Sequence, residues 1–199
     1  MMLIEEATVP DAALPVDQFK AHLRLGTGFG EDSLQDEVLK GFLRAAISAI
    51  EARTGKALIS RSFTMRLHAI RDRMSQAFPV APVSAISRLV LVDGQGNETE
   101  IPADRYRLEA DNHQPRLRPT GALLPAVPSG GALRVEFVAG FAVDWGGLPA
   151  DLGQAVLLLA AHYYEYRSET ALGDGCMPFG VTSLIQRYRH MRLGLGVAR

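Results

Sequence analysis

The sequence contains a single cysteine, Cys176. One thiol cannot form an internal disulfide framework and is typical of a reducing compartment. No histidine stands beside Cys176 in the sequence to lower the pKa of its thiol, so the residue is better interpreted as a small loop residue than as a nucleophile.

Long apolar runs and a basic N-terminal segment are also missing. The longest strongly apolar stretch, residues 155–161, is much shorter than the roughly 20 residues that a membrane-spanning helix needs. Residues 1–15 contain Glu5, Glu6 and Asp11 but no lysine or arginine, whereas a secretory signal begins with basic residues before an apolar run. We therefore expect a soluble protein that stays in the cytoplasm when made and has no membrane partner.

Motifs for catalysis and for cofactor binding are absent. Glycines at 26, 28 and 30 follow a helical pattern and lack the Gly-Lys-Ser or Gly-Lys-Thr ending of a phosphate-binding loop. No Gly-x-Ser-x-Gly elbow occurs. No two histidines are spaced as metal ligands on one helix face, and no cysteine pair exists. We predict no enzyme activity, catalytic residue, cofactor or metal; the widely separated histidines are His22, His68, His113, His162 and His190.

An overall basic excess is missing too. The formal net charge is -1 at pH 7, whereas proteins that bind nucleic acid by themselves usually carry surplus positive charge against the phosphates. The charge is unevenly spread, because no acidic residue follows Asp174. The C-terminal segment is therefore basic and the remainder mildly acidic; the arginines of this segment are Arg187, Arg189, Arg192 and Arg199.

Helical patterns occupy the N-terminal part of the chain. Residues 16–25 predict a short helix that stops at the following glycines. A longer helix begins near residues 32–33, and apolar residues at spacings of three and four predict one buried stripe along it. The helix is expected to end at Thr54, with Gly55 suited to a left-handed position after the last turn.

Two more helices are expected in the C-terminal part. One covers about residues 149–168, with Asp151 able to cap its first turn. The other covers about residues 181–192. Between them lies a glycine-rich loop at 173–180.

The middle of the chain has the period of strands. From residue 62 to residue 69, apolar and polar residues alternate, as in a strand with one buried face. No helical pattern separates the predicted strands, so an antiparallel arrangement is favoured over a βαβ series. Further strands are expected at 86–92, 99–101, 106–108 and 132–138, with a glycine-containing turn at 93–97.

Together these patterns predict the α+β class. We expect a four-helix core made from the two ends of the chain, with a small antiparallel β-rich insert in the middle. The expected divisions are 1–57 for the first half of the helical core, 58–144 for the insert, and 145–199 for the second half with a basic C-terminal tail.

The aromatic segment 162–167 has two interpretations. Tyrosines can stack on nucleic-acid bases. Successive side chains on a helix point about 100° apart, however, so three neighbouring aromatic side chains cannot form one flat platform. Core packing on one side and a subunit contact on the other is the better interpretation.

Several segments in order give the chain a family resemblance. They are 16–25 (VDQFKAHLRL), 50–58 (IEARTGKAL), 82–86 (PVSAI), 133–141 (LRVEFVAGF) and 161–167 (AHYYEYR). In their order and spacing, which cover about residues 16–167, the chain resembles the head-tail connector (adaptor) family of tailed bacteriophages and phage-like gene transfer agents.

The resemblance implies a structural role without catalysis. In such a family, copies form a closed ring, here expected to contain twelve, between the portal protein and a tail-side neck or stopper protein. Double-stranded DNA passes through the ring without specific contacts. The expected location is the host cytoplasm during assembly and then the neck of the particle.

Two sets of residues are hypothesised to make these contacts. Deletion of residues 181–199 is expected to prevent attachment to the portal while leaving the subunit folded. The hypothesised portal contacts are Arg187, Arg189, Arg192, Leu193, Leu195 and Arg199, and the hypothesised subunit contacts are Tyr164, Tyr166 and Arg167.

Other functions stay open on the sequence alone. The arginines of the C-terminal tail also fit a DNA-binding module, which would show strong salt-dependent binding. They fit equally a solvated, frayed terminus. A particle-associated hydrolase is suggested only by polar residues of the β-rich insert that have no assigned role.

Overall fold

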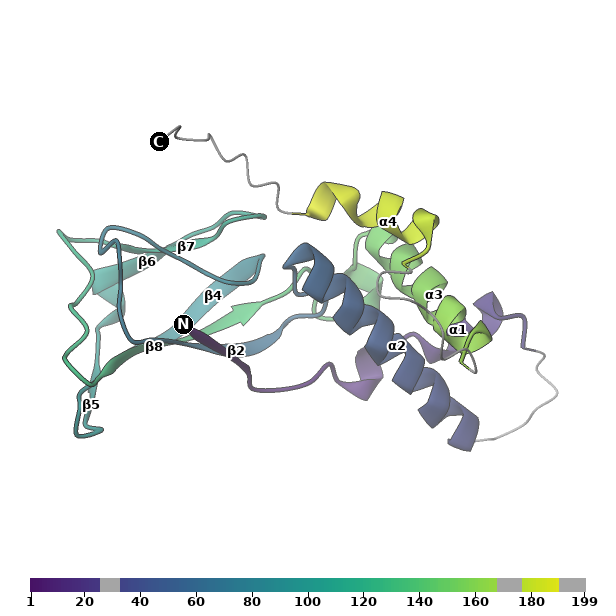
Figure 1. The fold of residues 1–199 in the computed structure, drawn as a ribbon, viewed down its shortest axis with the longest axis horizontal. Helices are drawn as coiled ribbons and strands as arrows, with labels where there is room; N and C mark the ends of the chain where they lie inside the picture. The colour runs from purple at the N-terminus through teal and green to yellow at the C-terminus, as the bar shows by residue number, and fades with distance from the viewer. Residues whose placement is uncertain (26–32, 168–176, 190–199) are drawn as a thin grey trace, which may run out of the picture.

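The computed structural model describes residues 1–25, 33–167 and 177–189. The molecule is elongated, with helices at one end and two β-sheets at the other (Figure 1). The helices are α1 (Val16–His22), α2 (Ser33–Thr54), α3 (Ala150–Glu165) and α4 (Phe179–Ile185). Short 3-10 segments are η1 (Asp11–Ala13), η2 (Ala103–Arg105), η3 (Trp145–Gly147) and η4 (Gln186–Tyr188).

Helix α2 forms as its sequence pattern predicts. Its fully buried residues Leu39, Leu43 and Ile50 lie on the stripe that packs against α3. The helix ends at Thr54, where Gly55 adopts φ +68° and donates its N–H to the carbonyl of Glu51 at 2.8 Å.

The other helices differ from expectation at their ends. The residue before α3 is Pro149, so Asp151 lies in the first turn and does not cap the helix. The last predicted helix, 181–192, begins earlier, at Phe179, and gives way to η4 after Ile185. Residues 190–192 lie outside the described part of the chain.

A five-stranded antiparallel sheet forms the larger β unit. Its central strand β8 pairs with β2 on one side and with β4 on the other, for example Val135 with Met65 and with Leu89. A second antiparallel sheet has three strands. The first sheet has the order β1 (Met2–Glu5), β2 (Arg61–Leu67), β8 (Ala132–Ala139), β4 (Val83–Val92), β5 (Glu98–Glu100), and the second has the order β3 (Gln76–Ala77), β7 (Arg116–Pro119), β6 (Tyr106–Glu109).

The buried residues divide into two clusters. One lies among the helices and contains Phe19, Leu159 and Ile185. The other lies between the two sheets, where the ring of Phe137 is 5.7 Å from that of Phe63 and 4.8 Å from that of Phe78.

These observations confirm the α+β class but not the four-helix core. Helices α1 and α4 have seven residues each, too short to flank the 22 residues of α2 along their length. Loop residues such as Leu14 and Ile59 complete the helical cluster, and the sheets bury a cluster of their own.

Candidate functional site

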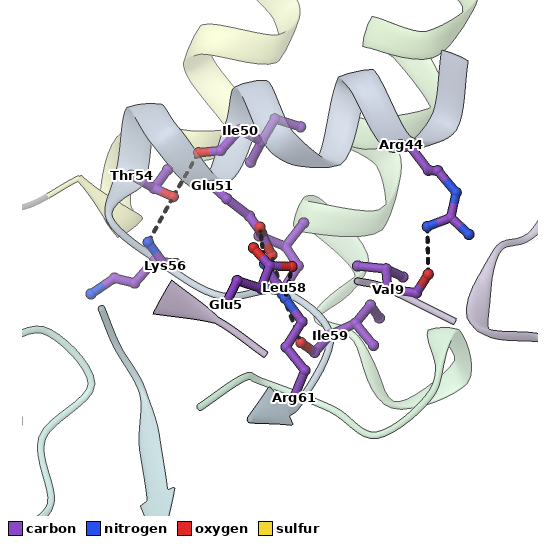
Figure 2. A network of polar contacts seen from close by, with 10 residues as sticks. All are labelled: Glu5, Val9, Arg44, Ile50, Glu51, Thr54, Lys56, Leu58, Ile59 and Arg61. Atoms are coloured by element: carbon purple, nitrogen blue, oxygen red, sulfur yellow. Dashed lines mark hydrogen bonds and ion pairs between the residues drawn. The ribbon is translucent and has the colours of Figure 1, made fainter. Parts of the chain in front are cut away.

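A polar network joins the sheet to the helices (Figure 2). The guanidinium of Arg61, on β2, donates to both carboxylate oxygens of Glu51, on α2, at 2.9 and 2.6 Å, and to Glu5, on β1, at 2.6 Å. Burial alone lowers the pKa of Arg61, but the hydrogen bonds to Glu51 and Glu5 outweigh it and hold that pKa above its usual value. Arg61 therefore stays charged. Its hydrogen bonds connect β1, β2 and α2 at the boundary between the two buried clusters.

The N-terminal segment is held along α2 by a second set of charges. The carboxylate of Asp11 accepts from Lys40 at 3.0 Å and from Arg44, which also donates to the carbonyl of Val9. Hydrogen bonds from Lys40 and Arg44 hold the pKa of Asp11 below its usual value. The network and this second set together fix how the N-terminal segment lies against the helices.

The three hypothesised subunit contacts meet at the C-terminal end of α3. The Tyr164 ring packs edge-on against Phe42 of α2 at 5.8 Å. The Arg167 guanidinium lies 4.6 Å above the Tyr164 ring and donates to the Tyr164 carbonyl at 3.0 Å. Tyr166 is 41% exposed, and its ring lies 4.7 Å from that of His162. Tyr164 is thus partly a core residue, whereas Tyr166 and Arg167 are open to a neighbour.

The C-terminal segment is anchored before it leaves the described region. The Tyr188 hydroxyl donates to Asp151 at 2.7 Å, and Arg187 pairs with the same carboxylate at 2.8 Å. The Tyr188 ring is also packed edge-on against Phe141 at 5.5 Å. Of the hypothesised portal contacts, Arg187 and Arg189 are exposed on this segment; Arg192, Leu193, Leu195 and Arg199 lie outside the described residues.

The expectation that residues 181–199 can be deleted without unfolding is wrong. Val181 and Ile185 are fully buried in the helical cluster, and Tyr188 is 8% exposed. Their removal would open a cavity against α3 and leave Asp151 without its partner. A truncation after Arg189 keeps Val181, Ile185 and Tyr188 in the chain.

A cleft of about 740 Å³ lies between the helical and the β-rich parts of the described chain, and we call it the basic cleft. It lies where the C-terminal end of α2, the strands β3 and β7, and the end of the described chain meet. Among the described residues that line it are three arginines and one histidine, and none is acidic. The lining residues are Met1, Arg53, Thr54, Gly55, Gln76, Ala77, Phe78, Pro79, Val80, His113, Gln114, Arg116 and Arg189.

The described residues form no metal centre. Within them, no three His, Cys, Asp or Glu side chains are close enough to hold a metal ion. The glycines at 26, 28 and 30 and Cys176 fall outside the described part of the chain. Over the same described ranges, no helix is both long enough and apolar enough to span a bilayer.

Comparison with known proteins gives close structural neighbours. No family model and no curated protein matches the sequence. A chain in the neck of an empty gene transfer agent (GTA) particle, computed with C6 symmetry, is 50% identical with a TM-score of 0.89, and the match covers 98% of this chain and 99% of that one.

Two further structures agree with the first. A chain from the virion of a native GTA particle is 49% identical with a TM-score of 0.85, and one from the neck of a native GTA particle, computed with C12 symmetry, is 47% identical with a TM-score of 0.84. Each match covers 98% of this chain and 99% of the other.

Proposed function

This chain belongs to the family of GTA neck proteins, and from that premise we propose that it is a head-tail connector (adaptor) subunit of a phage-like particle. The observation that carries the proposal is identity of 47–50% over nearly the whole of both chains. A likeness in fold alone would not support a function. A match of this extent includes surfaces as well as core, and it favours a structural role over catalysis.

We further propose that the chain acts in a ring of twelve copies. Twelvefold symmetry was applied to one of the similar neck structures and sixfold symmetry to another, and a ring of twelve is compatible with both. A closed ring needs two different complementary surfaces on each subunit. Tyr166 and Arg167, together with the edge of Tyr164, would supply part of one such surface.

The C-terminal segment is the proposed contact with the portal protein. The hydrogen bond from Tyr188 to Asp151 fixes the point from which this segment starts, so the residues after it can reach outward from a defined place. Arg187 and Arg189 would meet acidic or polar groups of the portal, joined by Arg192, Leu193, Leu195 and Arg199. Oppositely charged surfaces raise the rate of docking and help to fix its register.

The rest of the proposed setting follows from the connector role. A tail-side neck or stopper protein would bind the opposite face of the ring, and double-stranded DNA would pass through it. A net charge of -1 suits a conduit, since a strongly basic channel would retain the phosphates. Assembly would take place in the host cytoplasm, before the subunit enters the neck of the particle.

A truncation after Arg189 tests the portal contact. Purified portal rings should bind the full-length chain but not the chain that lacks residues 190–199, as measured by co-sedimentation. The thermal unfolding midpoints of the two proteins should agree, because the described contacts of Tyr188 remain. Equal co-sedimentation of both proteins would contradict the proposed contact.

A further inference from the structure

We propose that the basic cleft is a docking site for an extended acidic segment of a neighbouring protein in the neck. The proposal rests on the proposed function only for the origin of that segment. Binding itself is a property of the purified chain, so the two proposals can fail separately.

The first argument is uncompensated charge. Arg53 and Arg189 are exposed, and neither forms an ion pair with a described residue. Among the described residues Arg116 donates to neutral groups, the hydroxyl of Ser75 at 3.0 Å and the side-chain amide oxygen of Gln114 at 3.2 Å, while Glu109, whose charge acts on Arg116, accepts its hydrogen bond from Arg118 at 2.6 Å. Three guanidinium groups therefore line one cavity, and none of the described lining residues carries a carboxylate.

Three arginines of the β unit, by contrast, are paired with acidic side chains. Arg88, Arg118 and Arg134 each hold a glutamate carboxylate at 2.6 to 2.7 Å. The three guanidinium groups of the cleft form no ion pair with a described residue, and they present planar donors suited to the carboxylates of another chain.

A buried lysine adds positive charge beside the cleft. Lys56 is 2% exposed, and its ammonium donates to the Asn112 carbonyl and lies 3.4 Å from Nδ1 of the lining residue His113. Asp111 is an acid whose charge acts on Lys56, but its carboxylate already accepts the backbone N–H groups of His113 and Gln114, at 2.6 and 2.7 Å. Because Asp111 stays ionised and offsets the charge of Lys56, the positive potential of the cleft comes from its three arginines.

The shape of the cleft favours a peptide over a DNA duplex. Phe78, Pro79 and Val80 give it an apolar side next to the cations, as in sites that bind an apolar side chain and orient it by a few polar groups. Phosphates of a duplex lie on a convex surface and bind to open basic faces. A concave pocket with an apolar side instead fits carboxylates that flank an apolar side chain.

The edge of a sheet also borders the cleft. Strand β3 is the edge of the three-stranded sheet, and the carbonyl of its residue Ala77 accepts the side-chain amide of Gln76 at 2.8 Å instead of a partner strand. An edge of this kind can hydrogen-bond an extended peptide by its backbone. The side-chain amide of Gln76 would give way to the backbone of the incoming segment.

Fluorescence anisotropy tests the binding. The probe is a short labelled peptide of glutamates and aspartates around one leucine, and the comparison probes are its lysine counterpart and a labelled DNA duplex of equal charge. We expect the acidic peptide alone to bind the full-length chain. The double variant Arg53→Glu, Arg116→Gln should bind it about tenfold more weakly, which corresponds to about 1.4 kcal/mol for the loss of two charge contacts.

The variants separate this proposal from the portal contact. Arg53 and Arg116 are not among the proposed portal contacts, so the double variant should still co-sediment with portal rings. The matched control is Arg66→Glu, which changes an exposed arginine of the same β unit outside the cleft and should leave peptide affinity unchanged. Equal weakening by both substitutions, or tighter binding of the duplex than of the acidic peptide, would overturn the proposal.

Cross-linking in assembled particles identifies the occupant. A photoreactive residue in place of Gln76 should cross-link to a segment rich in aspartate and glutamate from another neck protein, mapped by mass spectrometry. The same residue in place of Arg66 serves as the control. A cross-link to DNA, to a second copy of this chain, or to nothing beyond the control would refute the inference.

Discussion

The guanidinium of Arg61 and the carboxylate of Glu51 form a bidentate ion pair at the boundary between the helical and the sheet clusters. The side chain of Arg61 is 7% exposed and that of Glu51 is 13% exposed, so water screens this pair little. Glu51 also accepts the N–H of Leu58 at 2.7 Å, and Leu58 lies in the segment that connects α2 to β2. The orientation of the sheets on the helices depends on this pair.

The first prediction concerns the loss of that pair. In Glu51→Ala the buried guanidinium of Arg61 keeps only Glu5 and the carbonyl of Ile59 as described partners. Removing one partner of a buried ion pair lowers the free energy of unfolding by about 3–5 kcal/mol. Chemical denaturation would measure it. The control is Glu100→Ala, which removes the partner of exposed Arg88 and should lower the free energy of unfolding much less, because water screens this pair. Similar losses in the two variants would show that burial of the Arg61 pair is unimportant.

The second prediction uses the buried lysine. Lys56→Met replaces a buried ammonium by an apolar side chain of similar length, and it should stabilise the fold at neutral pH because methionine avoids the cost of burying a charge. Burial lowers the pKa of Lys56, so its charge costs stability in full below the folded-state pKa. That cost disappears as the pH rises from the folded-state pKa of Lys56 to the pKa of a lysine in the unfolded chain, about 10.4.

The gain in the free energy of unfolding from Lys56→Met should therefore shrink as the pH rises from the folded-state to the unfolded-state pKa of the lysine.

Lys40→Met provides a control with a pH dependence of opposite sign. Hydrogen bonds to Glu37 and Asp11 raise the pKa of Lys40, so its charge stabilises the fold below the unfolded pKa, and this contribution is lost as pH rises through the folded pKa. Urea titrations from neutral to alkaline pH measure both variants. A gain from Lys56→Met that does not change with pH would contradict the assignment.

The third prediction concerns a glycine that the fold requires. Gly140 follows β8 with φ +149°, and a Cβ there would lie 2.3 Å from Cα of Ser60. Gly140→Ala should cost more than about 2 kcal/mol, because backbone on both sides must move. Gly41→Ala on α2 meets nothing within 4 Å and should raise stability by about 0.5–1 kcal/mol. Equal thermal unfolding midpoints for the two variants would contradict this.

The sequence predicts the elements whose signal is local. The spacing of Leu39, Leu43 and Ile50 defines α2, and the alternation around Met65 defines β2, so no tertiary information is needed for either. The strands β1, β3 and β7 were missed. β1 and β3 have only four and two residues, and β7 carries Pro119 and two arginines. Such strands exist because a partner strand supplies the hydrogen bonds.

Some features of the candidate site can also be predicted from the sequence, and others cannot. The arginines after Asp174 are visible in the sequence as a change of charge, and so is the aromatic segment at the end of α3. The basic cleft is not, because Arg53, Arg116 and Arg189 come from three segments that are distant in the sequence and line one cavity only in the folded chain. The anchoring of Tyr188 on Asp151 likewise joins residues 37 positions apart.

The last prediction tests the proposed ring contact through Tyr166. Because 41% of this residue is exposed and its packing partner is the neighbouring His162 on the same helix, Tyr166→Ser should leave the thermal unfolding midpoint nearly unchanged. Truncation of an aromatic side chain in an interface can cost about 2 kcal/mol, and a closed ring repeats that loss at every contact. Occupancy of the neck, measured by electron microscopy of particles, should fall sharply.

Met74→Ser is the matched control, since Met74 is 51% exposed and lies on the β unit far along the chain from α3. It removes a similar apolar area but no proposed contact, so occupancy should stay at the level of the unaltered protein. Arg167→Glu should act in the same direction as Tyr166→Ser, because its guanidinium lies over Tyr164 at the same end of α3. If the Tyr166 and Met74 variants filled the neck equally, the ring contact would have to lie on another face of the subunit.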